Sequence, residues 1–364
     1  MMKRKVFIAL LLCMTFTFGN FKSVFSTTYE NKELISYSGS YQLEKEYISK
    51  WLELNRYGIN RISNPIELFN INGDVEAVCF DINTSGYIII NIHNYDITEF
   101  SFDAKKPISD KKIIYDGPLK YYIEEQGKLI NVKTNKAYSK SLFQINKPRV
   151  TLSNSEKYRK LTSIINDTDL EVRSSFFENG FLSNSLVTWS SSYYCSVDAS
   201  AILLKYLSMY KDYRFLPSGY TTNNKVQEFL VNNRYILDQS NSPSDVAYGG
   251  VPYMVYDGSM LVTKYSKGIT GYLSDMSLSH YSVYWSMYNF NTIKQQINNN
   301  NPVYTSIDSN NSPWSENHAV VTHGYMVGYD GVPFIIVNDN FGNNNISING
   351  SQSYFTTKGM WYIN

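Results

Sequence analysis

The sequence predicts an α+β protein in two parts, because helical and strand-like patterns occur together in each half of the chain. In the first half, a helical pattern at residues 41–57 precedes several runs rich in β-branched and aromatic residues. In the second half, an apolar helical pattern at 195–210 precedes further strand-like runs. At 364 residues, the chain is too long for one typical hydrophobic core and suits two domains.

The first 26 residues have the features of an export signal. Lys3, Arg4 and Lys5 precede the apolar run "VFIALLLCMTFTF", which is short for a membrane-spanning helix. We therefore expect residues 1–26 to be a signal peptide that is cleaved before Thr27. The mature protein would then be secreted to the extracellular space and hold no membrane segment. An uncleaved membrane anchor is the alternative, although no stop-transfer pattern follows.

Charge and cysteine content argue against two classes of protein. The formal net charge is +1, and removal of residues 1–26 would make the chain slightly acidic, so electrostatics give no reason to expect nucleic-acid binding. Only Cys79 and Cys195 remain beyond that segment, whereas a disulfide-stabilised secreted scaffold usually has four or more cysteines. We expect packing to stabilise the fold and Cys195 to be a free thiol.

Residues 27–145 are predicted to form a small α+β unit. Its helix lies at 41–57, and its strands are expected at 75–82, 86–102 and within 116–132. The helix has one apolar face, which consists of Leu43, Tyr47, Ile48, Trp51 and Leu52.

Residues 146–185 carry charge, Ser and Asn without sustained periodicity. We interpret them as a linker with one short helix, in which a protease would find accessible chain. Residues 186–364 have the size of a single domain. Helices are expected there at 195–210, 223–233 and 291–299, and strands at 302–307, 318–328 and 333–338.

Cys195 stands at the start of a helix that is apolar almost all round, which is typical of a helix buried at the centre of a domain. A thiol at the N-terminal end of a helix lies in the positive field of the unpaired amides, which lowers its pKa toward the reactive thiolate. The alternative is an inert core cysteine. This stretch alone leaves both interpretations open.

The last third of the chain supplies a base and a group to orient it. His318 opens a predicted strand, and Asn338 and Asp339 close the strand that follows it across a hairpin. The hairpin can therefore bring the imidazole next to a carboxamide or a carboxylate. His323 lies five positions after His318, so in an extended strand it points to the opposite face and is expected to be structural.

The remaining candidates for chemistry are interpreted as structural. Cys79 lies inside a strand-like run, where a small buried hydrophobe is expected. His93 has no ligand-spaced partner, and His280 is expected at the surface. Since the histidines form no cluster with cysteines or carboxylates, the sequence predicts no metal site and no cofactor.

Three stretches resemble motifs of the papain-like cysteine peptidases of bacteria, in particular the bacteriocin-processing-type and streptopain-type enzymes. The stretch "YYCSVDASA" is similar to their nucleophile motif and implies that Cys195 is the nucleophile. "NHAVVTHGYMVGYD" implies His318 as the base. "FIIVNDNFG" resembles the segment Val-Asn-Asp-Pro-x-x-Gly and implies Asp339 as the orienting residue, with Asn338 as its substitute. The implied fold of residues 186–364 is a central helix packed on an antiparallel sheet.

The first half also resembles the pro-segments of such secreted enzymes. The resemblance implies a zymogen whose own pro-segment binds in cis, with residues 27–185 covering the cleft until the linker is cut.

Two positions depart from the family pattern. Family members usually carry Gln about six residues before the cysteine, where its amide donates to the oxyanion; this chain has "WSSS" at 189–192. We expect Ser190, Ser191 or the backbone amide of Cys195 to substitute in part, since loss of one donor costs about 10²- to 10³-fold in rate. Asp198 replaces the usual Thr, and its charge would oppose thiolate formation unless a protonated imidazole lies close by.

The expected function is hydrolysis of peptide bonds in peptide or protein substrates by a cysteine-type peptidase with a Cys-His-Asp(Asn) mechanism. Two alternatives remain at this point. One is a secreted binding protein built on a catalytically weak or inactive papain-like fold. The other is a related acyltransferase or amidase, because the same nucleophile and base serve other acceptors.

Overall fold

The computed structural model describes most of the chain from Tyr41 onward, and these residues belong to one compact unit, Tyr41–Asn364. The described residues are 41–58, 61–106, 111–140, 151–165, 177–190, 195–233, 235, 246–247, 251–252, 262–307, 318–351 and 359–364. The predicted signal peptide lies outside them. Within these ranges, no helix combines the length and apolarity needed to cross a membrane.

The first half contains a helix and several strands, as the sequence predicts, but it shares one compact unit with the second half. Helix α1 (Gln42–Leu54) buries Tyr47, Ile48, Trp51 and Leu52 of the predicted apolar face, while Leu43 is partly buried. The run predicted at 86–102 is two strands, because the Asn91 side chain accepts from the main-chain amide of His93 at 2.8 Å and closes a turn between them. The strands are β1 (Ile62–Phe69), β2 (Val75–Ile82), β3 (Gly86–Asn91), β4 (Ile97–Ser101), β5 (Ile113–Tyr115), β6 (Tyr121–Glu125), β7 (Lys128–Asn131) and β8 (Ala137–Ser139).

The segment between the halves contains the expected short helix, α2 (Asn154–Ile165), and then a strand, β9 (Glu178–Phe181), which pairs with β14. The second half has the predicted helices and strands. Its helices are α4 (Cys195–Tyr210), the 3₁₀ turn η2 (Tyr213–Phe215), α5 (Asn223–Asn232), α6 (Val262–Asp275) and α7 (Phe290–Asn298). Its strands are β10 (Val246–Ala247), β11 (Val251–Pro252), β12 (Val283–Met287), β13 (Val303–Ile307), β14 (His318–Val327), β15 (Pro333–Asn338), β16 (Ile346–Asn349) and β17 (Gly359–Ile363).

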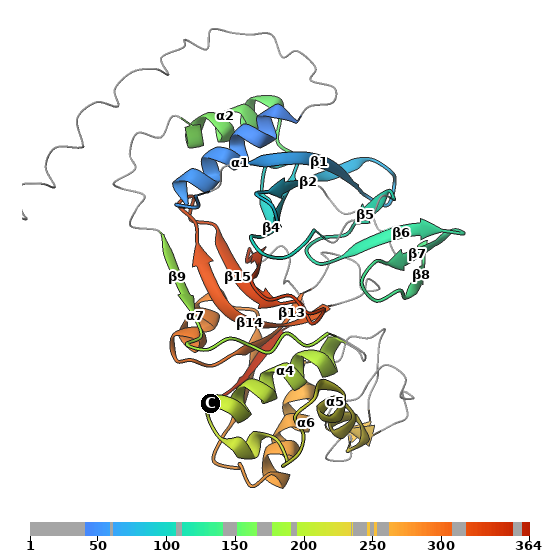
Figure 1. Ribbon diagram of the computed structural model, residues 1–364, viewed down its shortest axis with the longest axis vertical. Coiled ribbons are helices and arrows are strands. Elements are labelled where there is room, and N and C mark those ends of the chain that lie inside the picture. Colours follow the sequence, from blue (N-terminus) through green and yellow to red (C-terminus); the bar gives the residue numbers. More distant parts are fainter. Residues whose placement is uncertain are drawn as a thin grey trace, which may run out of the picture. The chain divides into compact units, whose positions relative to one another are not determined.

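Both halves contribute to one sheet (Figure 1). Strands β4 and β16 join them, with Phe100 opposite Ser347 and Glu99 opposite Ile348. The pairs are antiparallel except for β1 with β5. Among the described residues the strand order is β12, β17, β13, β14, β15, β16, β4, β3, β2, β1, β5, β6, β7 and β8, with β9 added beside β14.

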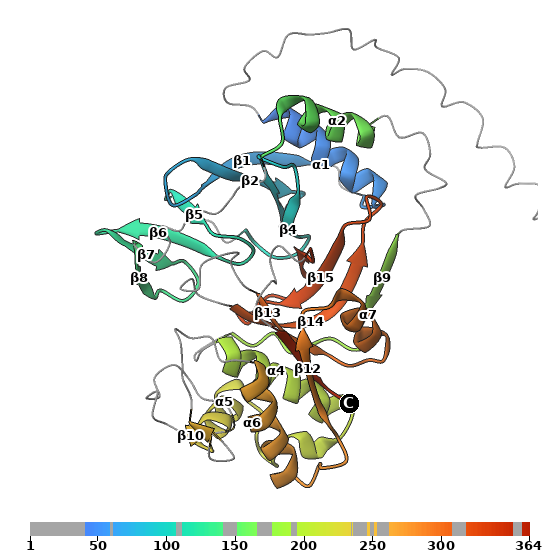
Figure 2. The same ribbon diagram turned by 180° about the vertical axis from the view of Figure 1, so that it is seen from behind.

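Helix α4 is the central helix of the second half. It is buried almost all round, as its apolar sequence predicts, and it packs against β13, β14 and α5. Helix α6 packs against β12 and β17 (Figure 2). The second half is therefore an α+β arrangement of helices on an antiparallel sheet.

A second core cluster is shared by the two halves. The Trp51 ring of α1 packs edge-on against Phe100 of β4 and Phe334 of β15, with centroids 5.4 Å and 5.6 Å away. Its indole nitrogen donates to the carboxylate of Asp330 in the β14–β15 turn at 3.0 Å. The first half is thus anchored to the hairpin that carries His318 and Asp339.

Candidate active site

Cys195 is the first residue of α4, at the position that the sequence predicts for it. Its side chain is partly buried and packs against the main core cluster. The first amides of a helix have no intrahelical acceptors and carry a partial positive charge, and Cys195 stands at this end of α4. Cys79, by contrast, is fully buried in β2, and burial raises the pKa of its thiol. The structural role expected for Cys79 fits this burial.

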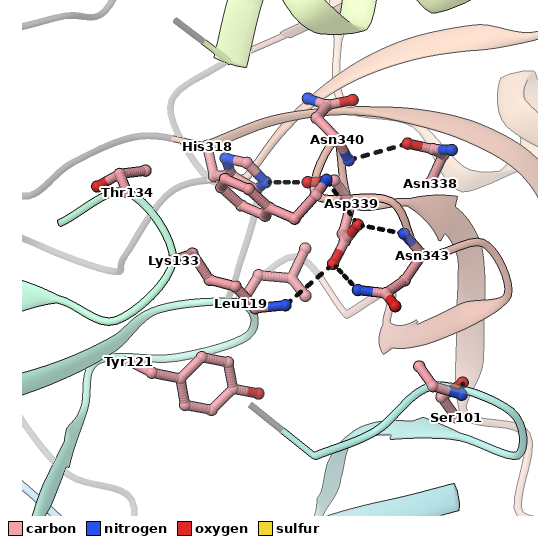
Figure 3. A network of polar contacts seen from close by, with 12 residues as sticks. Ser101, Leu119, Tyr121, Lys133, Thr134, His318, Asn338, Asp339, Asn340 and Asn343 are labelled. Atoms are coloured by element: carbon pink, nitrogen blue, oxygen red, sulfur yellow. Dashed lines mark hydrogen bonds and ion pairs between the residues drawn. The ribbon is translucent and has the colours of Figure 1, made fainter. Parts of the chain in front are cut away.

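His318 is the first residue of β14, and its ring nitrogen faces Asp339 (Figure 3). Its Nε2 lies 3.0 Å from the main-chain oxygen of Asp339. Its ring stacks on Phe341 with centroids 5.2 Å apart and planes 7° from parallel. A carbonyl oxygen can only accept, so this contact requires the proton on Nε2. The neutral imidazole then has its lone pair on Nδ1, the atom that can accept a proton from a thiol.

Burial and nearby lysines keep the imidazole neutral. Burial lowers the pKa of His318; the contact with Asp339 and its negative charge oppose this effect, and the positive charges of Lys120 and Lys133 add to it. Both lysines belong to the first half of the chain. The first half therefore disfavours the imidazolium that a thiolate would pair with.

The carboxylate of Asp339 is fully buried and holds the turn after β15. Its Oδ1 accepts from the main-chain amides of Phe341 at 2.8 Å and Asn343 at 3.0 Å. Its Oδ2 accepts from the Asn343 side chain at 2.7 Å and faces Lys133 Nζ at 3.3 Å. In this structure Asp339 thus meets the imidazole through its main chain, while its carboxylate meets the turn and Lys133. Its predicted role as the orienting carboxylate remains a prediction.

The side chains of the two asparagines beside Asp339 donate hydrogen bonds to main-chain oxygens. Asn338, the predicted substitute, donates to the main-chain oxygen of Val187 at 3.1 Å and to the side chain of Asn344 at 2.6 Å. Asn340 donates from its side chain to the main-chain oxygens of Cys195 at 3.1 Å and Ala319 at 2.5 Å. The start of α4 and the start of β14 are therefore joined through one amide.

Asn340 did not emerge from the sequence as a candidate. The signal was present, since Asn340 occupies the position that the similar family segment fills with proline. A residue that replaces proline regains a main-chain donor and, here, a side-chain amide.

The predicted oxyanion donors are only partly described. Ser190 is exposed and forms an isolated β-bridge with Phe341, and its main-chain oxygen accepts from the Asn223 side chain at 2.7 Å. Ser190 therefore lies beside the turn that follows Asp339. Ser191 lies outside the described residues. The oxyanion role of both serines remains a prediction.

Asp198 and the other histidines make different contacts. Asp198, in the first turn of α4, is buried and accepts from the side chain of buried Gln227 on α5. His323 is buried at an irregularity in the pairing of β14 with β15. His93 lies 3.7 Å from Glu76, and His280 is exposed and packs against its neighbour Tyr281 with the two rings tilted by 42°.

The comparison with protein families supports a peptidase-like interpretation of the second half. Residues 181–358 match the model of the Peptidase_C39 like family. The matched range contains α4, β14 and β15, and therefore Cys195, His318 and Asp339. No curated protein matches the chain. Together, the match and the α+β fold support a cysteine peptidase-like domain over residues 181–358.

Proposed function

We propose that this protein is a cysteine peptidase in which Cys195 is the nucleophile and His318 the general base. One observation carries the proposal: inside the region that matches the peptidase family, the Asn340 amide joins the main chain of Cys195 to the strand that His318 opens. A nucleophile at a helix N-terminus and a base with a lone pair on Nδ1 are the two groups that thiol-based acyl transfer needs.

Acylation begins with transfer of the Cys195 thiol proton to His318 Nδ1. The sulfur attacks the carbonyl carbon of a peptide bond, and an S–C bond forms. When the tetrahedral intermediate collapses, the C–N bond breaks and His318 gives the proton to the leaving amine. The main-chain oxygen of Asp339 stabilises the imidazolium by accepting from Nε2.

Deacylation repeats these roles with water. His318 takes a proton from water, the oxygen forms a bond to the acyl carbon, and the S–C bond breaks. The proton returns to sulfur, and a carboxylic acid leaves. We assign oxyanion donation to the backbone amide of Cys195, with Ser190 or Ser191 as the additional donor.

We further propose that the protein is secreted and made as a zymogen with residues 27–145 as its pro-segment. The export-signal pattern of residues 1–26 supports secretion. Lys133, in the turn after β7, supports the pro-segment role because it lies 3.3 Å from Asp339 beside the candidate base. Cleavage is assigned to the segment 146–185.

The proposal is tested with the purified chain and two single variants, Cys195→Ala and His318→Ala, with Cys79→Ala as the matched cysteine control. We expect the chain and the control to degrade fluorescein-labelled casein and to be cut between residues 146 and 185, whereas both site variants stay intact and inactive. Iodoacetamide at pH 6 should label Cys195 quickly. An ordinary thiol with a pKa near 8.5 hardly reacts at this pH, so fast labelling identifies an activated thiol. Absence of casein cleavage, together with slow labelling at pH 6, would contradict the peptidase proposal.

Two further results separate the alternative functions. Fast labelling without casein cleavage would favour an acyltransferase or amidase. Slow labelling together with tight binding of a ligand would favour a binding protein.

A further inference from the structure

Asn340 stands directly after Asp339, and its side chain contacts both elements of the candidate site. Its Nδ2 donates to the main-chain oxygen of Cys195, the first residue of α4, and to that of Ala319, which follows His318 in β14. The distances are 3.1 Å and 2.5 Å. Two oxygens that accept from one nitrogen must themselves be neighbours. The bond pair therefore sets how closely the start of α4 approaches the start of β14.

The amide of Asn340 has one possible orientation. Carbonyl oxygens only accept, so the nitrogen with its two hydrogens must face them, and the reversed amide would bring three oxygens together. The side-chain oxygen of Asn340 is buried and has no hydrogen-bond partner among the described residues. Burying an unpaired acceptor costs free energy. In this structure, the two hydrogen bonds that Nδ2 donates offset the cost of burying the unpaired side-chain oxygen.

The backbone holds the amide in place. Asn340 has φ of 60°, the left-handed region that Asn and Gly tolerate best. Its main-chain amide donates to the Asn338 side chain at 2.9 Å, and its own side chain is fully buried. The residue is thus held both through its main chain and through its side chain.

We propose that Asn340 is a positioning residue, which sets the separation of the Cys195 thiol and the His318 imidazole for both proton transfers. This inference rests on the proposed peptidase function. Asn340 acts through the main chain of its neighbours and not on the substrate. Its loss should therefore lower kcat and leave KM nearly unchanged. Misplacement of a catalytic group by about 1 Å costs about 10²-fold in rate, and this is the size of the kcat loss we expect.

The test uses Asn340→Gly in the full chain after its own processing. Glycine keeps the left-handed backbone and removes only the amide. Asn345→Gly is the matched control, because Asn345 also has φ of 60° but is exposed, with its side chain on Asp103. Casein hydrolysis gives kcat and KM. The amount of Cys195 that iodoacetamide labels quickly at pH 6 counts the active sites, because the thiol of an unfolded chain hardly reacts there, and kcat is expressed per active site.

We expect kcat per site to fall about 100-fold for Asn340→Gly, with KM within about twofold, and to stay unchanged for the control. A merely structural role would reduce the number of labelled sites or the melting temperature but leave kcat per site as in the unmodified chain. That result would overturn the inference. Absence of activity in the unmodified chain would instead overturn the proposed function, and the inference with it.

A second variant tests the chemistry of the amide. Asn340→Asp has the same shape but, when ionised, turns oxygen toward the two carbonyls. We expect a larger loss than for Asn340→Gly near pH 7. Because the protonated carboxyl can donate one hydrogen bond, the ratio of the variant's kcat to that of the unmodified chain should rise as pH falls. A ratio independent of pH would argue against the two donated bonds.

Discussion

Lys133 Nζ lies 3.3 Å from Asp339 Oδ2, so a residue of the first half supplies a positive charge inside the candidate site. The same nitrogen lies 5.4 Å from the centre of the Phe341 ring, on which His318 stacks. Lys133 and Lys120 both lower the pKa of His318. A thiolate paired with an imidazolium is therefore less stable while the first half is bound.

Replacing Lys133 should raise the reactivity of Cys195. In Lys133→Ala the pKa of His318 rises, because one positive charge beside the buried ring is removed. More of the ring is protonated at pH 6, and the thiolate gains a counter-ion. We expect iodoacetamide labelling of Cys195 at pH 6 to quicken by about 3- to 10-fold, equivalent to at most about one pKa unit. Lys128→Ala, an exposed lysine at the start of β7, is the control; equal labelling rates for both variants would disprove the effect.

Cutting the chain between residues 146 and 185 should by itself leave the two halves associated, so activation of the proposed zymogen also requires the first half to move away from Asp339. Strand β4 pairs with β16, and Trp51 packs on Phe334 and donates to Asp330 across the two halves. We expect both pieces to elute together in gel filtration under native conditions and to separate only in denaturant. Trp51→Ala removes a buried ring from the shared core, at a typical cost of about 3–5 kcal/mol. It should make the cut pieces separate more readily, whereas separation of the unmodified pieces in buffer would refute the shared core.

His323 should make the fold less stable as the medium becomes acidic. Burial lowers the pKa of His323 to about 4, while in the unfolded chain histidine titrates near 6.5. Between these values the unfolded chain binds a proton that the folded chain does not, so stability falls as pH falls from 6.5 toward 4. The full effect is about 3 kcal/mol. Urea unfolding at several pH values should give a shallower pH slope for His323→Asn, and no change for His280→Asn, which replaces an exposed histidine.

The buried pair of Asp198 and Gln227 should matter for stability. Gln227 is fully buried and donates to the carboxylate of Asp198 in the first turn of α4. Gln227→Leu removes this donor and leaves a buried carboxylate with one fewer bond. We expect the free energy of unfolding to drop by about 1–3 kcal/mol in urea titrations. Glu228→Ala, on the exposed side of the same helix, should change it by less than about 0.5 kcal/mol; similar losses for both variants would show that the pair contributes little.

Several elements were predictable because their residues repeat with a strong period. Helix α4 has the predicted bounds, and the predicted strands at 318–328 and 333–338 are β14 and β15 within one residue at each end. These elements were predictable because an apolar helix and strands of β-branched residues are stable only when they are buried in a core, and this pattern is visible in the local sequence.

Other elements were not predictable because their sequences weaken the local signal. Strand β1 contains Pro65 and an irregular register between Ser63 and Ile66, and proline inside a run argues against a strand. Helix α6 contains Gly268, which lowers helix propensity. The structure explains this glycine: a Cβ there would lie 2.0 Å from the main-chain oxygen of Tyr235.

The sequence by itself determined which residues could do chemistry: a cysteine at the start of an apolar helix, a histidine at the start of a strand, and the Asn-Asp pair that ends the next strand. The tertiary structure decided which atoms of these residues contact one another and which contact other parts of the chain. The carboxylate of Asp339 is occupied by its own turn and by Lys133, which lies about two hundred residues earlier. Side-chain partners so distant in sequence are set by packing of the sheet, and no local pattern encodes them. Asn340 was not predictable from the sequence for the same reason, because its amide bonds to the start of α4 and the start of β14, which come together only in the folded chain.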